Sequence, residues 1–231
     1  MTKVGRACID KWEAHLVVEP EGTPHPYYER PRSGGVYKAV SAPSVFPQAY
    51  VNRIESEQAC VRAGKRLCTL DEWYRACQGP KGFVYPYGNQ LEARRCNSSK
   101  AHLLSRKFGN DPRSWSYEKH FNHPSLDQEQ GFLARTGEHT GCESAGGAFD
   151  LVGNLHEWVS DRVDSSLPHK VPLQEDVAKK VGPRTGNAIF MGGFFSTTAE
   201  HGPGCRFVTI GHEAKYHDYS TGFRCCTDAL R

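Results

Sequence analysis

Two helices stand out in the pattern of apolar and polar positions along the chain. The first is expected at residues 55–63, with Gly64 as the residue that ends it. The second begins at Thr69, because residues 69–72 (TLDE) form a capping box in which a threonine hydroxyl and a glutamate carboxylate satisfy free backbone N–H groups. This second helix is expected to bury the face that its apolar residues share, namely Leu70, Trp73, Tyr74 and Cys77.

Strands are expected to be short and separated by long turn-rich segments. Residues 7–18 predict a first pair of strands, and residues 188–195 predict a strand interrupted by two glycines. Residues 204–227 predict a strand, a loop and a last strand. Because Gly and Pro together make up roughly one residue in six, irregular structure should dominate. We expect an irregular excursion at 19–49, a decorating segment at 85–148 and a surface loop at 162–187.

Charge and hydropathy exclude two classes of protein. The 231 residues include 29 Lys and Arg against 26 Asp and Glu, a formal charge of +3 without a basic block, so nothing indicates nucleic-acid binding. No apolar run approaches the roughly 18 residues that a transmembrane helix needs, so we expect no membrane span. The length suits one domain, or two small ones, and is ample for a core.

Nine cysteines indicate an oxidising compartment. Disulfides persist outside the cytosol, and the spacings are not those of a zinc site because no C-x-x-C occurs. We therefore expect a secreted, periplasmic or lipoprotein-type chain with up to four disulfides and one odd thiol. No signal peptide is visible at Met1-Thr2-Lys3, which we interpret as a processed boundary, and a cytosolic protein is the alternative.

Six short segments, taken in order, point to one family. The most specific are GKRL-x₄-EW at 64–73, GN-x-x-EW at 153–158 and GFR at 222–224, joined by CIDKWE, YPYGN and MGGF. Together they resemble the formylglycine-generating-enzyme, or sulfatase-modifying-factor, domain family over residues 8–226. The resemblance implies one domain, 1–231, with a C-type-lectin-like α+β fold that has little regular secondary structure and is held by disulfides.

The resemblance also implies a chemistry that this chain departs from. The best-known members oxidise a substrate cysteine to formylglycine and hold copper with two cysteines that follow a Gly-Gly-Ser strand. Thiolates suit Cu(I), a soft ion. The corresponding stretch, 192–205, has one cysteine, Cys205, at the place of a structural cysteine, and Phe194 stands where the family has serine. The standard oxidase reaction is therefore not supported.

Two disulfides are implied by the same resemblance. Cys60 resembles the partner of Cys225, and Cys77 resembles the partner of Cys205. Each bridge would close a long loop, worth roughly 4–5 kcal/mol in the chain-entropy model. The remaining five cysteines have no assigned partner: Cys8, Cys68, Cys96, Cys142 and Cys226.

A calcium loop is implied at residues 150–157. In the family the ligands fall on the positions of the Asp150 side chain, the Gly153 and Leu155 carbonyls and the Glu157 carboxylate, which suits an ion that prefers oxygen. The alternative is a helix start, with Asp150 as N-cap and Glu157 solvated or ion-paired. A possible second calcium site would use Asn97.

Histidines near the family's copper region raise a further possibility. His201, Cys205, His212 and His217 could hold copper, iron or zinc in a rebuilt oxidative centre. The alternative is that Cys205 is disulfide-bonded and the histidines are ordinary loop residues. His156 replaces a family tryptophan beside the expected substrate position, and its alternative is a packing role.

Two functions remain open at this level. One is a metal-dependent oxidative modifier of a peptide or small molecule, acting through His201, Cys205 and His212. The other is a non-catalytic, calcium-bound, lectin-like module that binds a peptide, protein or glycan. No G-x-S-x-G, H-E-x-x-H or P-loop motif supports hydrolysis or nucleotide binding. Candidates for exposed aromatic residues that stack on a ligand are Trp115, Tyr216 and Tyr219.

Overall fold

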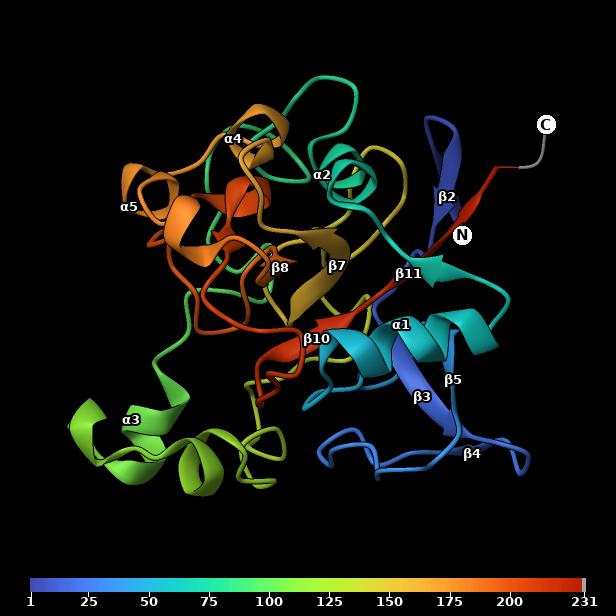
Figure 1. The fold of residues 1–231 in the computed structure, drawn as a ribbon, viewed down its shortest axis with the longest axis vertical. Coiled ribbons are helices and arrows are strands. Elements are labelled where there is room, and N and C mark those ends of the chain that lie inside the picture. Colours follow the sequence, from blue (N-terminus) through green and yellow to red (C-terminus); the bar gives the residue numbers. More distant parts are fainter. Residues whose placement is uncertain (230–231) are drawn as a thin grey trace.

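A sheet built from both ends of the chain anchors the fold, which a computed structural model describes for residues 1–229 (Figure 1). Its strands lie in the order β1-β2-β11-β6, and every pairing is antiparallel. Strands β2 and β11, from opposite ends of the chain, therefore lie side by side. The strands are β1 (Thr2–Val4), β2 (Ala7–Ile9), β11 (Cys225–Asp228) and β6 (Arg66–Leu67).

The second sheet lies at the centre of the molecule and has the order β10-β7-β8-β9 (Figure 1). Its longest strand, β7, pairs in parallel with β10 and antiparallel with β8. Residues 156–159 at the start of β7 are all buried, so the sheet is covered on both faces there. The strands are β10 (Thr221–Phe223), β7 (His156–Arg162), β8 (Ala188–Met191) and β9 (Val208–Thr209).

The third sheet corrects two expectations from the sequence. Its strands are β4 (Thr23–Pro24), β3 (Ala14–Val18) and β5 (Tyr37–Ser41), in that order. Residues 7–18 do contain two strands, but β2 and β3 belong to different sheets, so the predicted pair is wrong. The excursion at 19–49 is mostly irregular, as expected, yet it also supplies β5, which runs along β3 for five residues.

Both predicted helices are present, and both begin with a capping box. Helix α2 (Leu70–Gln78) starts after Thr69 as predicted, and the Thr69 and Glu72 side chains each accept the other's backbone N–H. Helix α1 (Arg53–Arg62) starts earlier than predicted, because Asn52 and Glu55 form a second capping box. The predicted face of α2, which includes Trp73 and Cys77, is buried.

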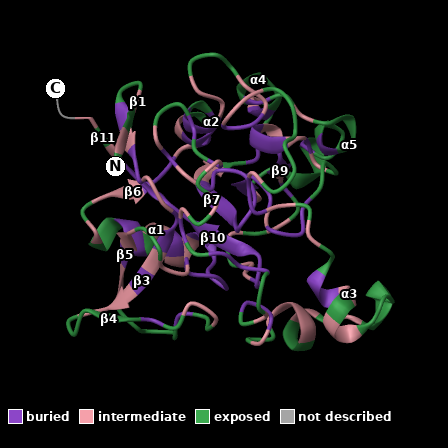
Figure 2. Cartoon of the chain, turned by 180° about the vertical axis from the view of Figure 1, so that it is seen from behind, coloured by how far each residue is buried: buried purple, intermediate pink, exposed green. Residues whose placement is uncertain are grey.

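The segments 85–148 and 162–187 contribute more buried residues to the core than predicted. Leu103, Leu104 and Leu126 from the first are fully buried and pack in one cluster with Tyr50 and Phe195. The predicted surface loop 162–187 likewise buries five apolar residues (Figure 2). Single apolar residues at irregular spacing give no periodic signal, so the sequence pattern hides them. The short helices here and nearby are α3 (Leu103–Phe108), η1 (Pro112–Ser114), η2 (Tyr117–Phe121, a π-helix), α4 (Leu167–Lys170), α5 (Glu175–Ala178), η3 (Gly182–Arg184) and η4 (Gly204–Arg206).

Four disulfides join these elements. The bridges Cys60–Cys225 and Cys77–Cys205 confirm the two predicted pairs. Two further bridges assign partners that the sequence left open, Cys68–Cys226 and Cys96–Cys142. Cys8 on β2 is the odd thiol. The predicted α+β fold with little regular secondary structure and several disulfides is therefore confirmed.

None of the helices within residues 1–229 combines the length and the hydropathy that a membrane span requires.

Candidate functional site

The loop from Asp150 to Glu157 leads directly into the central sheet. Asp150 and Asn154 have positive φ angles of 59° and 56°, and β7 begins at His156. Gly153 has φ 81°, and a Cβ there would lie 2.1 Å from the Asn97 carbonyl oxygen, so only glycine fits. The alternative of a helix start with Asp150 as N-cap is therefore wrong.

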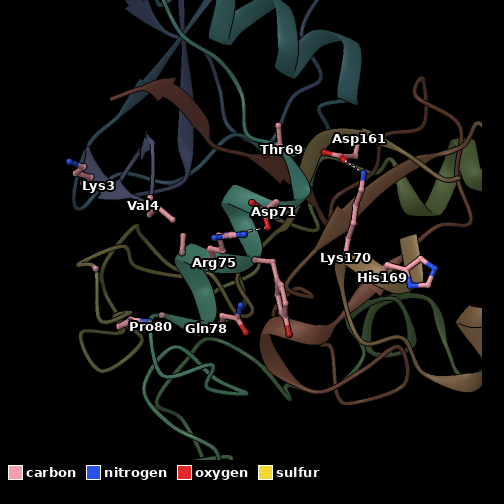
Figure 3. Close-up of a pocket in the computed structure, with 15 residues that line it drawn as sticks. Lys3, Val4, Thr69, Asp71, Arg75, Gln78, Pro80, Asp161, His169 and Lys170 are labelled. Atoms are coloured by element: carbon pink, nitrogen blue, oxygen red, sulfur yellow. Dashed lines mark hydrogen bonds and ion pairs between the residues drawn. The ribbon is translucent and has the colours of Figure 1, made fainter. Parts of the chain in front are cut away.

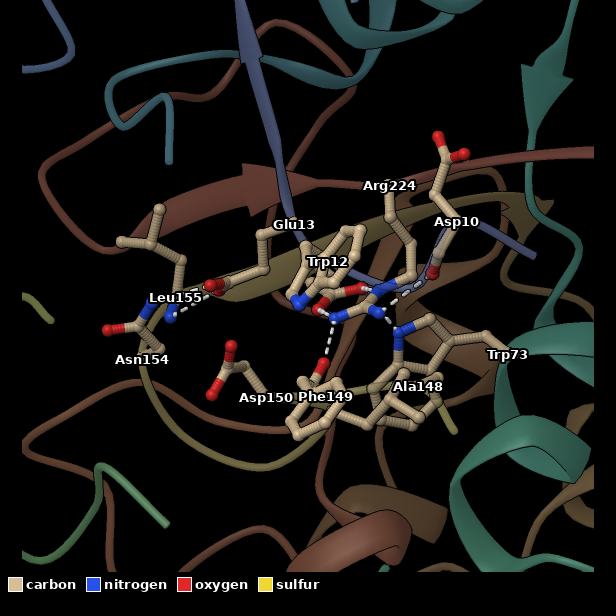
Figure 4. A network of polar contacts seen from close by, with 12 residues as sticks. Asp10, Trp12, Glu13, Trp73, Ala148, Phe149, Asp150, Asn154, Leu155 and Arg224 are labelled. Carbon is tan, nitrogen blue, oxygen red and sulfur yellow. Dashed lines mark hydrogen bonds and ion pairs between the residues drawn. The ribbon is translucent and has the colours of Figure 1, made fainter. Parts of the chain in front are cut away.

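Glu157 lies in a buried ion pair with Arg224 from the GFR motif (Figure 4). The Arg224 Nε and Nη2 atoms donate to its two carboxylate oxygens at 2.6 Å each, and Trp73 Nε1 donates to one of them at 2.7 Å. Arg224 also donates to the carbonyl oxygens of Asp10 and Phe149. The three most specific sequence motifs thus meet at one carboxylate.

Two further carboxyl groups surround this pair. Glu13 accepts hydrogen bonds from the Leu155 N–H and the Asn154 amide, and it is fully buried. Burial and the neighbouring Asp150 and Glu157 raise the pKa of Glu13 well above its usual value. Burial likewise raises the pKa of Asp150 to about 7. Three acidic side chains therefore share one guanidinium.

These oxygens partly fit the implied calcium ion. One Asp150 oxygen accepts the Gly137 N–H at 2.7 Å. Among the turn and loop hydrogen bonds of residues 1–229, none ends on the Gly153 or Leu155 carbonyl. Glu157 accepts three N–H donors, so it could join only through a remaining lone pair.

At the possible second site, hydrogen bonds to neighbouring groups hold the Asn97 side chain. The Asn97 amide donates to the Phe132 carbonyl and to Asn154. The Lys100 ammonium donates to the same Phe132 carbonyl at 2.7 Å. Among residues 1–229 the buried Asn97 Oδ1 atom has no hydrogen-bond partner, so it is free to act as a ligand and calcium at Asn97 stays a prediction.

A small apolar pocket is lined in part by the 192–205 stretch, which resembles the family's copper region. It has a volume of about 120 Å³. Gly192, with φ 83°, lets the chain pass close to α2, because a Cβ there would lie 2.6 Å from the Leu151 carbonyl oxygen and 2.9 Å from the Trp73 ring. Hydroxyl groups at the wall come from Ser98, Ser99, Thr197 and Thr198, and apolar groups come from Tyr85, Leu91, Val152, Ala199 and Phe207.

His156 packs behind this pocket in a box of aromatic rings. Its ring centroid lies 4.5 Å from that of Phe190, 5.0 Å from Phe194 and 5.3 Å from Phe207. The residue is buried, which lowers the pKa of its imidazole far below the usual value. Phe207 lies between His156 and the pocket, so the packing role expected as the alternative is the one observed.

The suggested rebuilt metal centre does not assemble. The Cys205 sulfur is bonded to Cys77, so it offers no thiolate. His212 stacks on Tyr216 at 3.7 Å, His201 lies near Asp176, and His217 bonds to the side chain of Asn122. Within residues 1–229 no three His, Cys, Asp or Glu side chains are placed to hold one metal ion.

The expected exposed aromatic residues offer little surface. Tyr219 is only 2% exposed, and Tyr216 and Trp115 are half-buried. Tyr216 donates its hydroxyl to Asp218, and Trp115 stacks on His102 with ring centroids 5.2 Å apart. The prediction of exposure is therefore wrong for Tyr219.

A large open depression lies elsewhere, between β1 and α2 (Figure 3). It is an open groove of about 1090 Å³. Its charged side chains mostly pair with one another, Arg75 with Asp71 and Lys170 with Asp161. Because surface pairs of this kind are already satisfied, the groove carries no chemistry of its own.

Comparison with known proteins agrees with this arrangement. The model of the sulfatase-modifying factor enzyme 1-like domain matches residues 19–229. The chain belongs to this family. The match includes Arg224, Glu157 and Trp73, which form the buried ion pair, as well as the pocket.

Relatives in this family share about a third of the aligned residues. The bovine (Bos taurus) inactive C-alpha-formylglycine-generating enzyme 2 is 30% identical over 122 residues, which are 52% of this chain and 35% of the relative. The mouse (Mus musculus) formylglycine-generating enzyme is 27% identical over 193 residues, 81% of this chain and 45% of the enzyme. The chain spans less than half the length of these relatives.

Solved structures align at low sequence identity. PvdO from Pseudomonas aeruginosa aligns with a TM-score of 0.46 and 13% identity, covering 87% of this chain and 70% of that protein. The Major Tropism Determinant U1 variant aligns with a TM-score of 0.48 and 13% identity, covering 96% of this chain and 50% of that protein.

Sequence reasoning missed three residues of the site. Glu13 contacts the 150–157 loop from 137 or more residues away, and Lys100 carries a charge that no motif marks. Thr197 lines the pocket. Of the three, only Glu13 could have been found from the sequence, because it ends the CIDKWE segment that resembles the family.

Proposed function

We propose that this domain is a non-catalytic binding module, and that the pocket beside Thr197 receives an apolar group of a peptide or small-molecule ligand. One observation carries the proposal: within 192–205, the stretch that resembles the family's copper region, Thr197 and Ala199 line the pocket and the Cys205 sulfur is bonded to Cys77. A relative whose name describes it as inactive supports the same interpretation.

The chemistry of the pocket sets the class of ligand. Its walls combine Phe207 and Val152 with the hydroxyl groups of Ser98 and Thr198. Such a pocket suits one apolar side chain whose neighbouring backbone bonds to hydroxyl groups at the rim. Its volume of about 120 Å³ leaves room for a single side chain rather than a whole cofactor.

Calcium is proposed as a structural ion of this module. The ligands would be the Asp150 carboxylate and the Gly153 and Leu155 carbonyl oxygens of the 150–157 loop. The Glu157 carboxylate, which Arg224 holds, would be an additional ligand. Buried acidic groups that outnumber the basic ones favour a divalent cation. The ion would fix the loop that leads into β7 and supports one wall of the pocket.

The proposed location is a periplasmic or extracellular compartment. Four disulfides join segments that lie 46 to 165 residues apart, and such bridges persist only where the surroundings are oxidising.

The pocket is tested by screening a random heptapeptide library against the protein. Replacing exposed Ala199 at the pocket rim with Trp should block the entrance and reduce the affinity of selected peptides at least tenfold. The matched control is Ala145→Trp, since Ala145 is also exposed but lies beside Gly79, away from the pocket. Equal affinity in both variants would place the binding surface elsewhere.

Oxidative modification of a ligand stays a prediction, and the contacts of His201, Cys205 and His212 do not favour it. It requires copper or iron, so metal analysis of protein purified under mild conditions decides between the two functions. Stoichiometric copper or iron, together with a free Cys205 thiol, would overturn the binding module. Calcium alone, with Cys205 still bonded to Cys77, supports it.

A further inference from the structure

Asp127 is a buried charged group that the pocket and the calcium loop do not use. Only 2% of its surface is exposed, and neither carboxylate oxygen has a hydrogen-bond partner. It lies in a turn after η2, where the Leu126 N–H bonds to the His123 carbonyl. A buried ionised carboxylate without any partner is costly, so this side chain requires a ligand or a proton.

A second buried carboxylate lies close to it. Asp218 is 4% exposed and accepts hydrogen bonds from the Ser220 N–H and hydroxyl and from the Tyr216 hydroxyl. Its charge raises the pKa of Asp127 beyond the effect of burial. No Lys, Arg or His within residues 1–229 forms an ion pair with either carboxylate. Two buried carboxylates thus lie in this region, and neither has a positively charged partner among residues 1–229.

Tyr50 connects the two segments that carry these carboxylates. The Tyr50 hydroxyl donates to the His123 carbonyl at 2.7 Å, and the Tyr50 N–H donates to the Asp218 carbonyl at 3.0 Å. The Tyr219 N–H donates to the Phe121 carbonyl at 3.2 Å, which holds the residue after Asp218 against the end of η2. Three segments distant in sequence therefore present oxygen atoms to one buried place.

We propose that Asp127 and Asp218 bind a hard divalent cation, with Tyr50 and the His123 carbonyl beside it. Two carboxylates neutralise one divalent ion, and calcium prefers a shell of oxygen ligands from side chains and carbonyls. The absence of sulfur and imidazole nitrogen from the contacts named above disfavours a soft metal. Both Asp127 oxygens, free of other bonds, are available for coordination.

The position of the site indicates its role. Asp127 follows the segment that carries α3 and η2, whereas Asp218 lies shortly before β10 of the central sheet. An ion shared between them would fasten this excursion to the core. The site is separate from the 150–157 loop, so it can be tested independently of the calcium ion proposed there.

Calcium binding is measured on the full chain after treatment with a chelator, by isothermal titration and metal analysis. Wild type should bind one calcium ion more than the isosteric Asp127→Asn variant. The Asp111→Asn control, on an exposed aspartate of the same excursion, should match wild type. An equal count in wild type and Asp127→Asn, including zero in both, overturns the proposal and leaves Asp127 as a protonated carboxylic acid.

A second measurement does not depend on the folding of Asp127→Asn. In the Asp150→Asn variant, which removes the other proposed ligand set, calcium should still slow proteolytic cleavage within residues 103–127 at least severalfold. Magnesium and calcium are compared at equal concentration to define the ion. Cleavage that neither ion slows would overturn the proposal, whereas failure of the Asp150 site alone would leave this protection unchanged.

Discussion

At the scale of single residues, Arg224 is the side chain on which the centre of the domain depends. It is completely buried, and it pairs with Glu157 while Glu13 and Asp150 lie nearby. Its guanidinium presents N–H donors in a planar fork that matches a carboxylate, and its other donors bind two backbone carbonyls. A lysine could not reproduce these contacts.

Replacing Arg224 with Met should therefore destabilise the domain by about 3–5 kcal/mol, because a buried carboxylate would lose its partner. Urea unfolding in calcium-saturated buffer measures the loss. The matched control is Arg75→Met, which removes an exposed ion pair with Asp71 and should change stability by less than about 1 kcal/mol. Similar losses in both variants would contradict the central role of Arg224.

His212 makes the stability of the domain dependent on acid. Burial lowers the pKa of its imidazole from 6.5 to about 4. The unfolded chain therefore takes up a proton at higher pH than the folded one, so stability is complete above pH 6.5 and falls as the pH drops toward 4. The full effect is on the order of 3 kcal/mol.

Melting temperatures between pH 4 and 7.5 test this dependence. His212→Gln should make the profile shallower over that range without removing the slope, because the lowered pKa values of His156 and His217 keep their own acid dependence, and exposed His169→Gln should leave the wild-type slope unchanged. A wild-type slope in His212→Gln would show that other groups cause the loss.

At the scale of elements, α2 connects most parts of the site. Its N-terminal capping box fixes where it starts, Trp73 bonds to Glu157, and Cys77 ties it to the turn that holds Cys205. The capping residues and the apolar stripe could be predicted from the sequence because both depend only on nearby residues. The partners of Trp73 and Cys77 lie 84 and 128 residues further on, so local pattern could not supply them.

Thr69→Ala should cost about 1 kcal/mol, since it leaves the Glu72 N–H without its side-chain acceptor. Equilibrium unfolding in urea measures the change. Ser165→Ala, at an exposed loop position, serves as the control and should lie within about 0.5 kcal/mol of wild type. A neutral Thr69→Ala variant would mean that packing alone fixes the start of α2.

At the scale of the whole molecule, disulfides hold together a chain with little regular structure. Cys60–Cys225 and Cys68–Cys226 attach two neighbouring positions of β11 to α1 and to the chain just after β6. These bridges close the N-terminal half onto the last strand. In the chain-entropy model each long loop contributes roughly 4–5 kcal/mol.

Protein purified without reductant and then denatured should expose a single reactive thiol, at Cys8. Alkylation followed by peptide mass spectrometry identifies the labelled cysteine. Cys8→Ser should abolish labelling and leave the melting temperature within a few degrees of wild type. Labelling of Cys205 or Cys77 in the untreated protein would contradict the disulfide that the proposed function depends on.

Ordered motifs and local spacing were enough to predict the family, the α+β class and both main helices, and the resemblance that those motifs carry implied two of the four disulfides. It also indicated that standard copper chemistry is not supported, from one cysteine where two are needed. Only the tertiary structure decided what Glu157, Asn97 and Cys205 contact. Arg224, Asn154 and Cys77 each approach from another part of the chain. Charge, burial and bonding at a site are properties of such non-local neighbours, and no single segment contains them.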